Sequence, residues 1–484
     1  MSESTITPTQ HGQGTLKRNA VGLTGAVIMS AALMGPAVSV YFNPQLVAGF
    51  AGAATPLVMV ISMVGVLIAA SGITAMAREL PSAGAFYTYV ARGLGPRSGF
   101  VTGGLMFVAY ALLVPAELAL IGIYSSDLLA SYGIQVHWAL ISLFFTALML
   151  VLSLRGIRGS LRTALVLFSA EVTVILVMSI IVLAKGGAHG LSLTPLNPAS
   201  SPKGVSGLAL GMVYGVLSFV GFEAATTLGE EVREPRRNVA RGIVLSTLFV
   251  GGIYLFCTYS EMIGFGTANA AKLAADQAPF NTLAATYAPW LKLFVGLAGI
   301  SSIFAVIMNS NNGIVRIIFA MGREGMLPRP LAHVNPRHHT PSTAIWAVGG
   351  FSALVTFAVG FGVGPFNAYA YLGALLTLAI LPVYVLTNLA CVRYFRRERR
   401  EHFSMLRHAV LPVVGIALML IPVYGSVWPI PAAPYNVFPY LVIAVIVATA
   451  LAATWLGRAR PGSLERAGAV LATGDADVAE AVSP

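Results

Sequence analysis

Long apolar runs alternate with short polar connections along almost the whole chain. A helix needs about 20 mostly apolar residues to cross a bilayer. Twelve runs meet or approach that length, at approximately 20–42, 54–77, 98–123, 137–154, 161–184, 207–229, 242–265, 290–315, 342–362, 366–391, 409–428 and 437–457. The runs lack the alternation of barrel strands, so only helices satisfy their backbone within lipid. The pattern predicts an all-α integral membrane protein with about twelve transmembrane helices.

Composition excludes a soluble globule. Hydrophobic residues make up 57% of the chain and charged residues 10%, whereas soluble domains are about a quarter charged. The net charge of +11 does not indicate a nucleic-acid partner, because the basic residues lie between apolar runs. Cys257 and Cys391 both fall inside apolar runs, without disulfide or metal-ligand spacing. We expect no metal and no cofactor, and the lipid bilayer as the surroundings.

The basic residues also predict an orientation. If both termini lie in the cytoplasm, 25 lysines and arginines fall in inner segments and four in outer loops. That bias agrees with the positive-inside rule and places the chain in the cytoplasmic membrane. No small-residue cleavage site follows the first run, so we expect no cleaved signal peptide. Residues 1–18 are predicted to be a cytoplasmic tail, and residues 458–484 a disordered cytoplasmic tail.

Two runs contain helix-breaking residues near their centres. Gly35-Pro36 divides the first run, since proline suits the start of a new helix with glycine before it. Gly215 and Gly221 loosen the sixth run. A simple kink is the alternative, but breaks in corresponding first and sixth spans are typical of inverted repeats around a binding site. Opposed half-helix ends with bare peptide groups would bind a zwitterion without a charged side chain.

Three stretches resemble a known family. They are ARELPSAGAFYTYVARGLGPRSGFVTGG (77–104), GFEAATTLGEEVREPRRNVARGI (221–243) and RIIFAMGREGMLPRPLAHVNPRHHTP (316–341). In this order they resemble bacterial amino-acid permeases of the amino acid–polyamine–organocation superfamily, with similarity over roughly 17–457. The resemblance implies a leucine-transporter-type fold, with spans 1–5 and 6–10 as inverted repeats within 19–400 and two further helices within 401–457. It implies secondary transport by alternating access.

The resemblance also implies where a substrate binds. The substrate carboxylate is expected at the backbone of Ala31, Ala32, Met34 and Gly35. The amino group is expected at the carbonyls of Phe219, Val220 and Gly221, with Phe222 as an aromatic gate. Many relatives carry a G-x-G stretch in span 1, whereas residues 30–35 here read SAALMG. The bulkier side chains leave an amine, or a differently spaced amino acid, open as the substrate.

Polar residues within the apolar runs are candidates for ion coupling. Glu171 lies at a depth where proton-coupled relatives carry an ionisable lysine, and a carboxyl in apolar surroundings is a candidate proton carrier. A buried acid paired with a polar neighbour is the alternative. Ser301 and Ser302 resemble the adjacent hydroxyls of sodium-coupled relatives, and hard cations prefer oxygen ligands. We favour proton coupling and keep sodium as the alternative.

Other polar groups have two interpretations each. Glu223 follows the predicted break, where it either caps free amides or contacts a substrate amine. Glu230 and Glu231 either form a breakable inner gate with arginines of other inner loops, such as Arg78 or Arg92, or belong to a solvated loop. Tyr110 lines the pathway or packs in the core. Glu117 and Glu261 are expected to be structural acids, hydrogen-bonded to neighbouring helices.

These patterns favour a transporter over other classes. A channel needs a continuous polar face, and the runs carry isolated polar groups instead. No Asp–His or Cys–His cluster falls within a span, so an enzyme is not expected. We expect an importer of an amino acid or related amine. The alternatives are a polyamine or amine permease, an amino-acid exchanger, or a nutrient sensor on the same scaffold.

Overall fold

The computed structural model describes residues 22–80, 85–156, 161–228, 232–323, 327–335, 337, 338 and 340–459. The predicted tail at 1–18 lies outside these ranges, as does the predicted tail at 458–484 beyond the end of the last helix. Within the described ranges the chain forms helices joined by loops, with an isolated bridge between Asn335 and Thr340.

The helices follow one another in the order of the predicted spans. Those before residue 230 are α1 (Leu23–Leu33), α2 (Pro36–Ala51), α3 (Thr55–Glu79), α4 (Ala85–Leu94), α5 (Pro96–Ala130), α6 (Trp138–Leu154), α7 (Leu161–Ala184), α8 (Gly204–Leu217) and the 3₁₀ helix η4 (Phe222–Leu228). Those after it are α9 (Pro235–Phe265), α10 (Ala270–Ala275), α11 (Pro279–Tyr287), α12 (Lys292–Arg323), α13 (Ser342–Val363), α14 (Pro365–Arg397), α15 (Leu411–Gly425) and α16 (Phe438–Ala459).

The described helices confirm a multi-span, all-α membrane fold. Nine helical segments in the described ranges are long and apolar enough to cross a membrane, and the first, Leu23–Glu79, contains α1, α2 and α3. The shorter apolar helices α6 and α8 stand where the sequence predicts the fourth and sixth spans. Three short helices, α4, α10 and α11, lie between predicted spans and were not anticipated.

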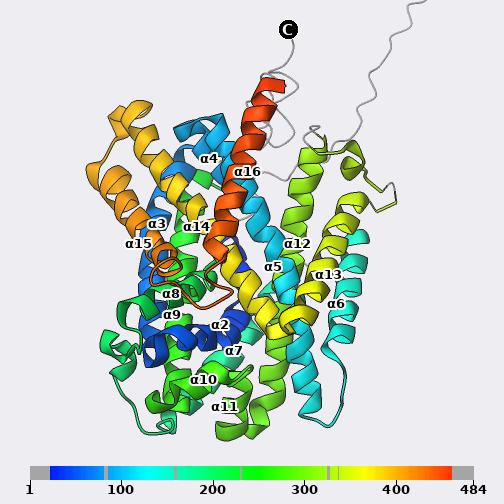
Figure 1. Ribbon diagram of the computed structural model, residues 1–484, viewed down its shortest axis with the longest axis vertical. Coiled ribbons are helices and arrows are strands. Elements are labelled where there is room, and N and C mark those ends of the chain that lie inside the picture. The colour runs from blue at the N-terminus through cyan, green and yellow to red at the C-terminus, as the bar shows by residue number, and fades with distance from the viewer. Residues whose placement is uncertain are drawn as a thin grey trace, which may run out of the picture.

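The broken helices lie inside the bundle. α2 packs against α8 (Figure 1). α1 packs against α9 and η4. α5, α12 and α14 pack around them, and their facing side chains are buried. The outer helices α6, α13 and α16 instead expose large apolar side chains such as Phe144, Leu354 and Trp455. Such an apolar outer surface suits lipid rather than water.

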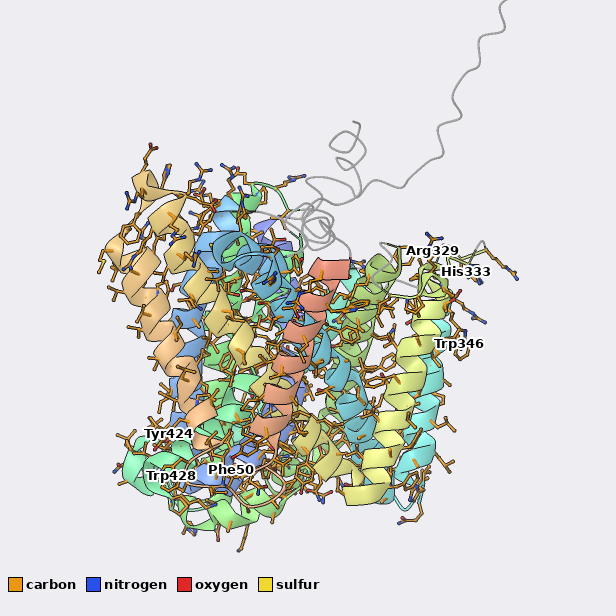
Figure 2. The ribbon with its side chains drawn as sticks, turned by 45° about the horizontal axis from the view of Figure 1, so that its top comes forward. Phe50, Arg329, His333, Trp346, Tyr424 and Trp428 are labelled. Atoms are coloured by element: carbon orange, nitrogen blue, oxygen red, sulfur yellow. The ribbon has the colours of Figure 1, made fainter. Side chains whose placement is uncertain are left out.

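The two ends of the bundle differ in chemistry. Arg329 and His333 lie at one end, while Tyr424, Trp428 and Phe50 lie at the other (Figure 2). Exposed tryptophan and tyrosine side chains are typical of the level of lipid head groups. The bundle therefore has the polarity of a chain set across a bilayer.

Candidate functional site

The first predicted span is broken, as its sequence indicates. α1 ends at Leu33 and α2 begins at Pro36. Gly35 between them has φ +55° and ψ +73°, a left-handed conformation that glycine adopts readily. A Cβ at Gly35 would lie 2.6 Å from Val38 Cγ1 and 2.7 Å from Val306 Cγ2. The break therefore requires glycine for both conformation and space.

The sixth predicted span is broken too, and its break touches the first. α8 ends at Leu217, residues 218–221 form a turn, and η4 begins at Phe222. Gly221 has φ +108°. A Cβ there would lie 2.9 Å from Leu33 Cγ and 3.1 Å from the Leu33 carbonyl oxygen. The backbone of the sixth span thus lies directly against the end of α1.

Peptide groups at the breaks are bonded to side chains, which corrects the expectation of bare groups facing each other. The Met34 carbonyl accepts hydrogen bonds from the hydroxyls of Tyr254 (2.8 Å) and Ser39 (2.9 Å). The Gly221 N–H donates to Glu223 Oε2 over 3.1 Å. The physical reason is that a buried peptide group without a partner is costly, so nearby polar side chains bind it.

The predicted carboxylate contacts lie in the last turn of α1 and at its break. They are Ala31, Ala32, Met34 and Gly35. The N–H groups of Met34 and Gly35 still donate within this turn, to the carbonyls of Ser30 (3.1 Å) and Ala32 (3.3 Å). A carboxylate prefers the amino end of a helix, and that end belongs to α2, since Pro36 is its first residue.

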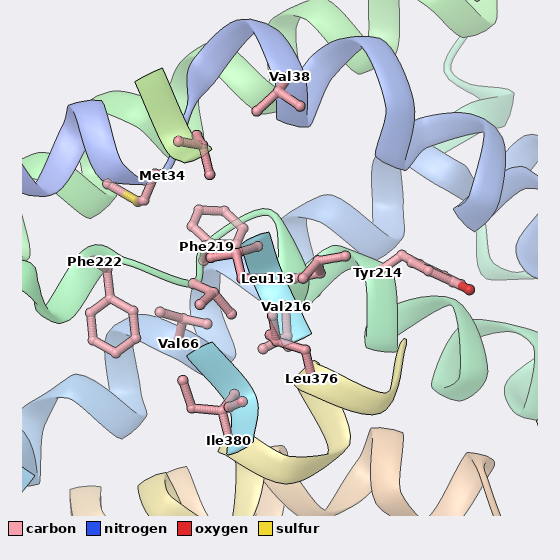
Figure 3. Close-up of a cluster of buried hydrophobic side chains, with 14 of the residues drawn as sticks. Met34, Val38, Val66, Leu113, Tyr214, Val216, Phe219, Phe222, Leu376 and Ile380 are labelled. Carbon is pink, nitrogen blue, oxygen red and sulfur yellow. The ribbon is translucent and has the colours of Figure 1, made fainter. Parts of the chain in front are cut away.

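The predicted amino-group contacts lie in the turn between α8 and η4. The carbonyl of Phe219 accepts from the Phe222 N–H (3.0 Å), and that of Gly221 from the Ala224 N–H (3.0 Å). Val220 is buried beside them. The Phe219 ring packs edge-on against Tyr254, with ring centroids 5.2 Å apart. Figure 3 shows Phe219 among these buried side chains, with Met34 on one side of it and Val216 on the other in this view.

Glu223 is held by groups from three elements. Tyr110 of α5 donates to Glu223 Oε1 over 2.8 Å, while Oε2 accepts the Gly221 N–H. The Tyr384 hydroxyl of α14 is close enough to interact electrostatically with the same carboxyl. Only 2% of Glu223 is exposed. The side chain therefore caps the amide at the break, which is the first of its two predicted interpretations.

Phe222, the predicted gate, is also buried. Its ring packs against that of Tyr384, with centroids 5.3 Å apart. Tyr384 thus contacts both the predicted gate and the carboxyl beside it. Tyr384, Tyr254 and Ser39 were not among the residues predicted from the sequence. The available signal was a hydroxyl group within an apolar span, which many core residues share.

The two candidate ion sites form one cluster. The carboxyl of Glu171 in α7 lies close enough to the hydroxyls of Ser301 and Ser302 in α12 to interact electrostatically with them, and Glu171 is 5% exposed. The Ser302 hydroxyl also accepts the N–H of Val38, in the first turn of α2, over 3.2 Å. The proton and sodium alternatives therefore concern the same place, next to the first break. Among the described residues, no group of three or more His, Cys, Asp and Glu side chains is placed to hold a metal ion.

The predicted inner gate is only partly covered by the structure. Glu230 and Glu231 lie outside the described residues. Arg78 lines a cavity of about 410 Å³ together with Glu79, Arg236, Arg237 and Arg241. The neighbouring acid Glu234 lies 3.9 Å from Arg237, and Arg92 lies 3.7 Å from Glu398. Arg92 is therefore paired within the described chain to an acid far from the 230–234 segment.

Glu117 and Glu261 differ from the expectation of hydrogen-bonded structural acids. Neither Glu261 oxygen has a hydrogen-bond partner among the described residues, although the side chain is fully buried. Glu117 Oε2 likewise has none. The expectation was wrong for Glu261, because no donor of a neighbouring helix lies within hydrogen-bond distance of its carboxyl among the described residues.

Comparison with known proteins identifies the scaffold. A family model described as amino acid permease matches residues 20–452. The low-affinity putrescine importer PlaP of Escherichia coli K12 is 25% identical over 414 residues, covering 85% of this chain and 88% of PlaP. The branched-chain amino acid permease BcaP of Bacillus subtilis is 24% identical over 426 residues, covering 84% and 87%. The chloroplastic cationic amino acid transporter 7 of Arabidopsis thaliana is 25% identical over 354 residues, covering 69% and 58%.

Proposed function

The chain belongs to the amino acid permease family, and on that premise we propose that it imports an amino acid or a related amine by alternating access, coupled to protons. The observation that carries the proposal is the contact between the two breaks, where Gly221 lies against Leu33. Irregular backbone at membrane depth is tolerated where it is buried in protein or lines a cavity. Two such segments in contact, in the first and sixth spans, are typical of a transporter site between repeats.

In this proposal the substrate competes with the side chains that now bind the breaks. The ammonium group of the substrate takes the place of hydroxyl donors at backbone carbonyls such as that of Met34, which Tyr254 and Ser39 bind. The carboxylate takes the amino end of α2, next to the predicted contacts Met34 and Gly35. Exchanging one hydrogen bond for another keeps the net cost of binding and release small, as a carrier needs.

We place the proton at Glu171. Its carboxyl lies near the Ser302 hydroxyl, and that hydroxyl accepts the Val38 N–H at the amino end of α2. Gain or loss of a proton on Glu171 changes the charge beside Ser302, and so changes the strength of the hydrogen bond that Ser302 accepts from α2. Ser301 and Ser302 supply oxygen ligands for the sodium alternative.

An amine is the second candidate substrate, because a carboxyl stands at the break. Glu223 is buried there, and a cationic amine without a carboxylate would bind it in place of the Tyr110 hydroxyl. One relative is named as a putrescine importer, which agrees with this candidate. We also propose that both termini face the cytoplasm, as the positive-inside rule indicates. The same holds for the end of the bundle where Arg329 and His333 lie, the arginine-rich end.

Uptake into proteoliposomes tests these proposals. The purified full chain would be supplied with labelled isoleucine, lysine and putrescine, with an inward proton gradient or with none. We expect saturable uptake of one class that rises with the gradient and persists when choline replaces sodium. Uptake that needs sodium would overturn the proton proposal, and a protein that binds these compounds without transporting any would favour a sensor.

A further inference from the structure

A second cavity opens at the arginine-rich end, away from the two breaks. It encloses about 560 Å³ between the end of α3, the end of α14 and the start of α15. The polar groups that matter here are Thr74, Arg78 and Glu79 of α3, and His402, Ser404 and Arg407 of the segment before α15. The three helices pack against one another, as Figure 1 shows at the upper left. The cavity therefore lies at a junction of helix ends, where lipid head groups lie in a bilayer.

The charge of this cavity is positive. Glu79 is the acid in its lining, and the Arg399 guanidinium lies 3.4 Å from the Glu79 carboxyl. Arg78 and Arg407 face the same cavity from two elements, and neither has a carboxylate partner within the described ranges. With Glu79 neutralised by Arg399, two guanidinium groups remain for an anion. Guanidinium groups suit phosphate because their donors match its oxygens.

The lining of the cavity includes a residue with an unpaired hydroxyl group. Ser71 lines the cavity, and its hydroxyl oxygen is buried with no partner in the part of the chain that the structure describes. Thr74 beside it bonds to the Ser71 carbonyl instead, over 2.9 Å. Buried hydroxyls normally have partners, so Ser71 has an unused donor close to the cavity wall.

The wall formed by residues 404–410 is held in an unusual shape. Residues Leu406–Val410 form a π-helical turn, a rare structure that frequently marks functional sites. The His408 ring stacks on Phe395 with centroids 3.7 Å apart and planes 7° apart. His408 Nδ1 also accepts the Ser404 N–H over 3.0 Å. These contacts fix the wall that carries Arg407 to the end of α14.

Apolar side chains continue from the mouth of the cavity along the outside of the bundle. Met405 and Leu406, which precede Arg407 in sequence, are 61% and 58% exposed. Val410 and Val413 of the next turns are exposed as well. Acyl chains gain free energy by covering such an apolar surface, whereas a water-soluble phosphate does not.

We propose that this cavity binds the head group of an anionic phospholipid, with its phosphate between Arg78 and Arg407 and its acyl chains along Leu406, Val410 and Val413. Basic pockets between helix ends are suited to such head groups. The bound lipid connects α15 to α3 and α14. The proposal does not depend on which substrate the protein carries.

Lipid titration of the purified full chain tests the proposal. Thermal unfolding and native mass spectrometry would be measured with phosphatidylglycerol, with phosphatidylcholine of the same acyl chains, and with inorganic phosphate. We expect phosphatidylglycerol to bind and stabilise the protein, while phosphatidylcholine binds more weakly and phosphate alone has no effect. Equal effects of the two lipids would overturn the proposal, and so would equal stabilisation by inorganic phosphate, which would indicate a site for free anions.

Variants locate the binding. Arg78→Gln and Arg407→Gln are each expected to weaken phosphatidylglycerol binding about fivefold, because one arginine near an anionic surface contributes about 1 kcal/mol. Arg329→Gln is the matched control, an exposed arginine at the same end of the bundle but outside the cavity. Equal affinity in all three variants would contradict the assignment. If Arg78→Gln does not fold, Arg407→Gln and the loss of wild-type binding at high salt decide the question.

Discussion

Val38 and Ser302 are joined by a hydrogen bond of 3.2 Å, from the backbone N–H of one to the hydroxyl of the other. Val38 lies in the first turn of α2, directly after the break, and Ser302 lies within α12. Since the Ser302 hydroxyl also lies near the Glu171 carboxyl, one hydroxyl connects the candidate ion site to the half-helix at the candidate substrate site. This connection is short enough for a change at Glu171 to act on α2 without a long chain of intermediates.

Removing the ionisable group at Glu171 is expected to remove the pH dependence of uptake. Glutamine keeps the size of the side chain and one acceptor oxygen but cannot gain or lose a proton. For wild-type uptake coupled to one proton, the ratio of inside to outside substrate concentration is expected to change by about tenfold per unit of pH gradient. Glu171→Gln is expected only to bring the two concentrations to equality. Substrate-induced thermal stabilisation is expected to persist in the variant.

Glu117→Gln is the control for that measurement. Glu117 is also a buried acid in a span, but it lies outside the Glu171–Ser302 cluster. It is expected to keep the wild-type pH profile. If uptake by Glu117→Gln were independent of pH while Glu171→Gln kept the wild-type pH profile, Glu117 rather than Glu171 would be the proton carrier.

Gly35→Ala is expected to destabilise the protein and impair transport. An L side chain at φ +55° costs about 1–3 kcal/mol, and the added Cβ would press on Val38 and Val306. Thermal unfolding of the purified variant measures the loss. Gly252→Ala in α9 is the matched control, because nothing lies within 4 Å of a Cβ built there. Its melting temperature is expected to match the wild type, and a similar fall in both variants would argue against strain at the break.

Tyr110→Phe is expected to lower stability by about 1–3 kcal/mol, because it leaves Glu223 Oε1 buried without its 2.8 Å donor. If Glu223 contacts a substrate amine, uptake of putrescine is expected to change more than uptake of isoleucine. Tyr132→Phe removes the hydroxyl of an exposed tyrosine and serves as the control. Equal melting temperatures for wild type and Tyr110→Phe would show that the carboxyl finds another donor.

Glu261→Met is expected to stabilise the protein. The wild-type carboxyl is fully buried with neither oxygen bonded in the described structure, and burial of an unpartnered polar group costs about 1–3 kcal/mol. Methionine has a similar length and no such cost. A higher melting temperature with unchanged uptake is the expected result. Lower stability would mean that Glu261 binds water or an ion in the folded protein.

The sequence by itself was sufficient to predict several features of the fold. Lipid offers no hydrogen bonds to the backbone, so long apolar runs predict helices without knowledge of their neighbours. The break at Gly35-Pro36 was also predictable, because glycine and proline act on the local chain. The depth of Glu171 and of Ser302 was readable from their places within apolar runs.

The meeting of distant groups required the folded bundle. Glu171 and Ser302 are far apart in the chain, and no local rule places their side chains in contact. The capping of the Gly221 amide by Glu223, with Tyr110 as a donor, likewise depends on how α5 lies against η4. Local sequence sets which segments become helices, since backbone energetics act over a few residues. Packing between helices sets which side chains meet, because it depends on the shapes of all surfaces at once.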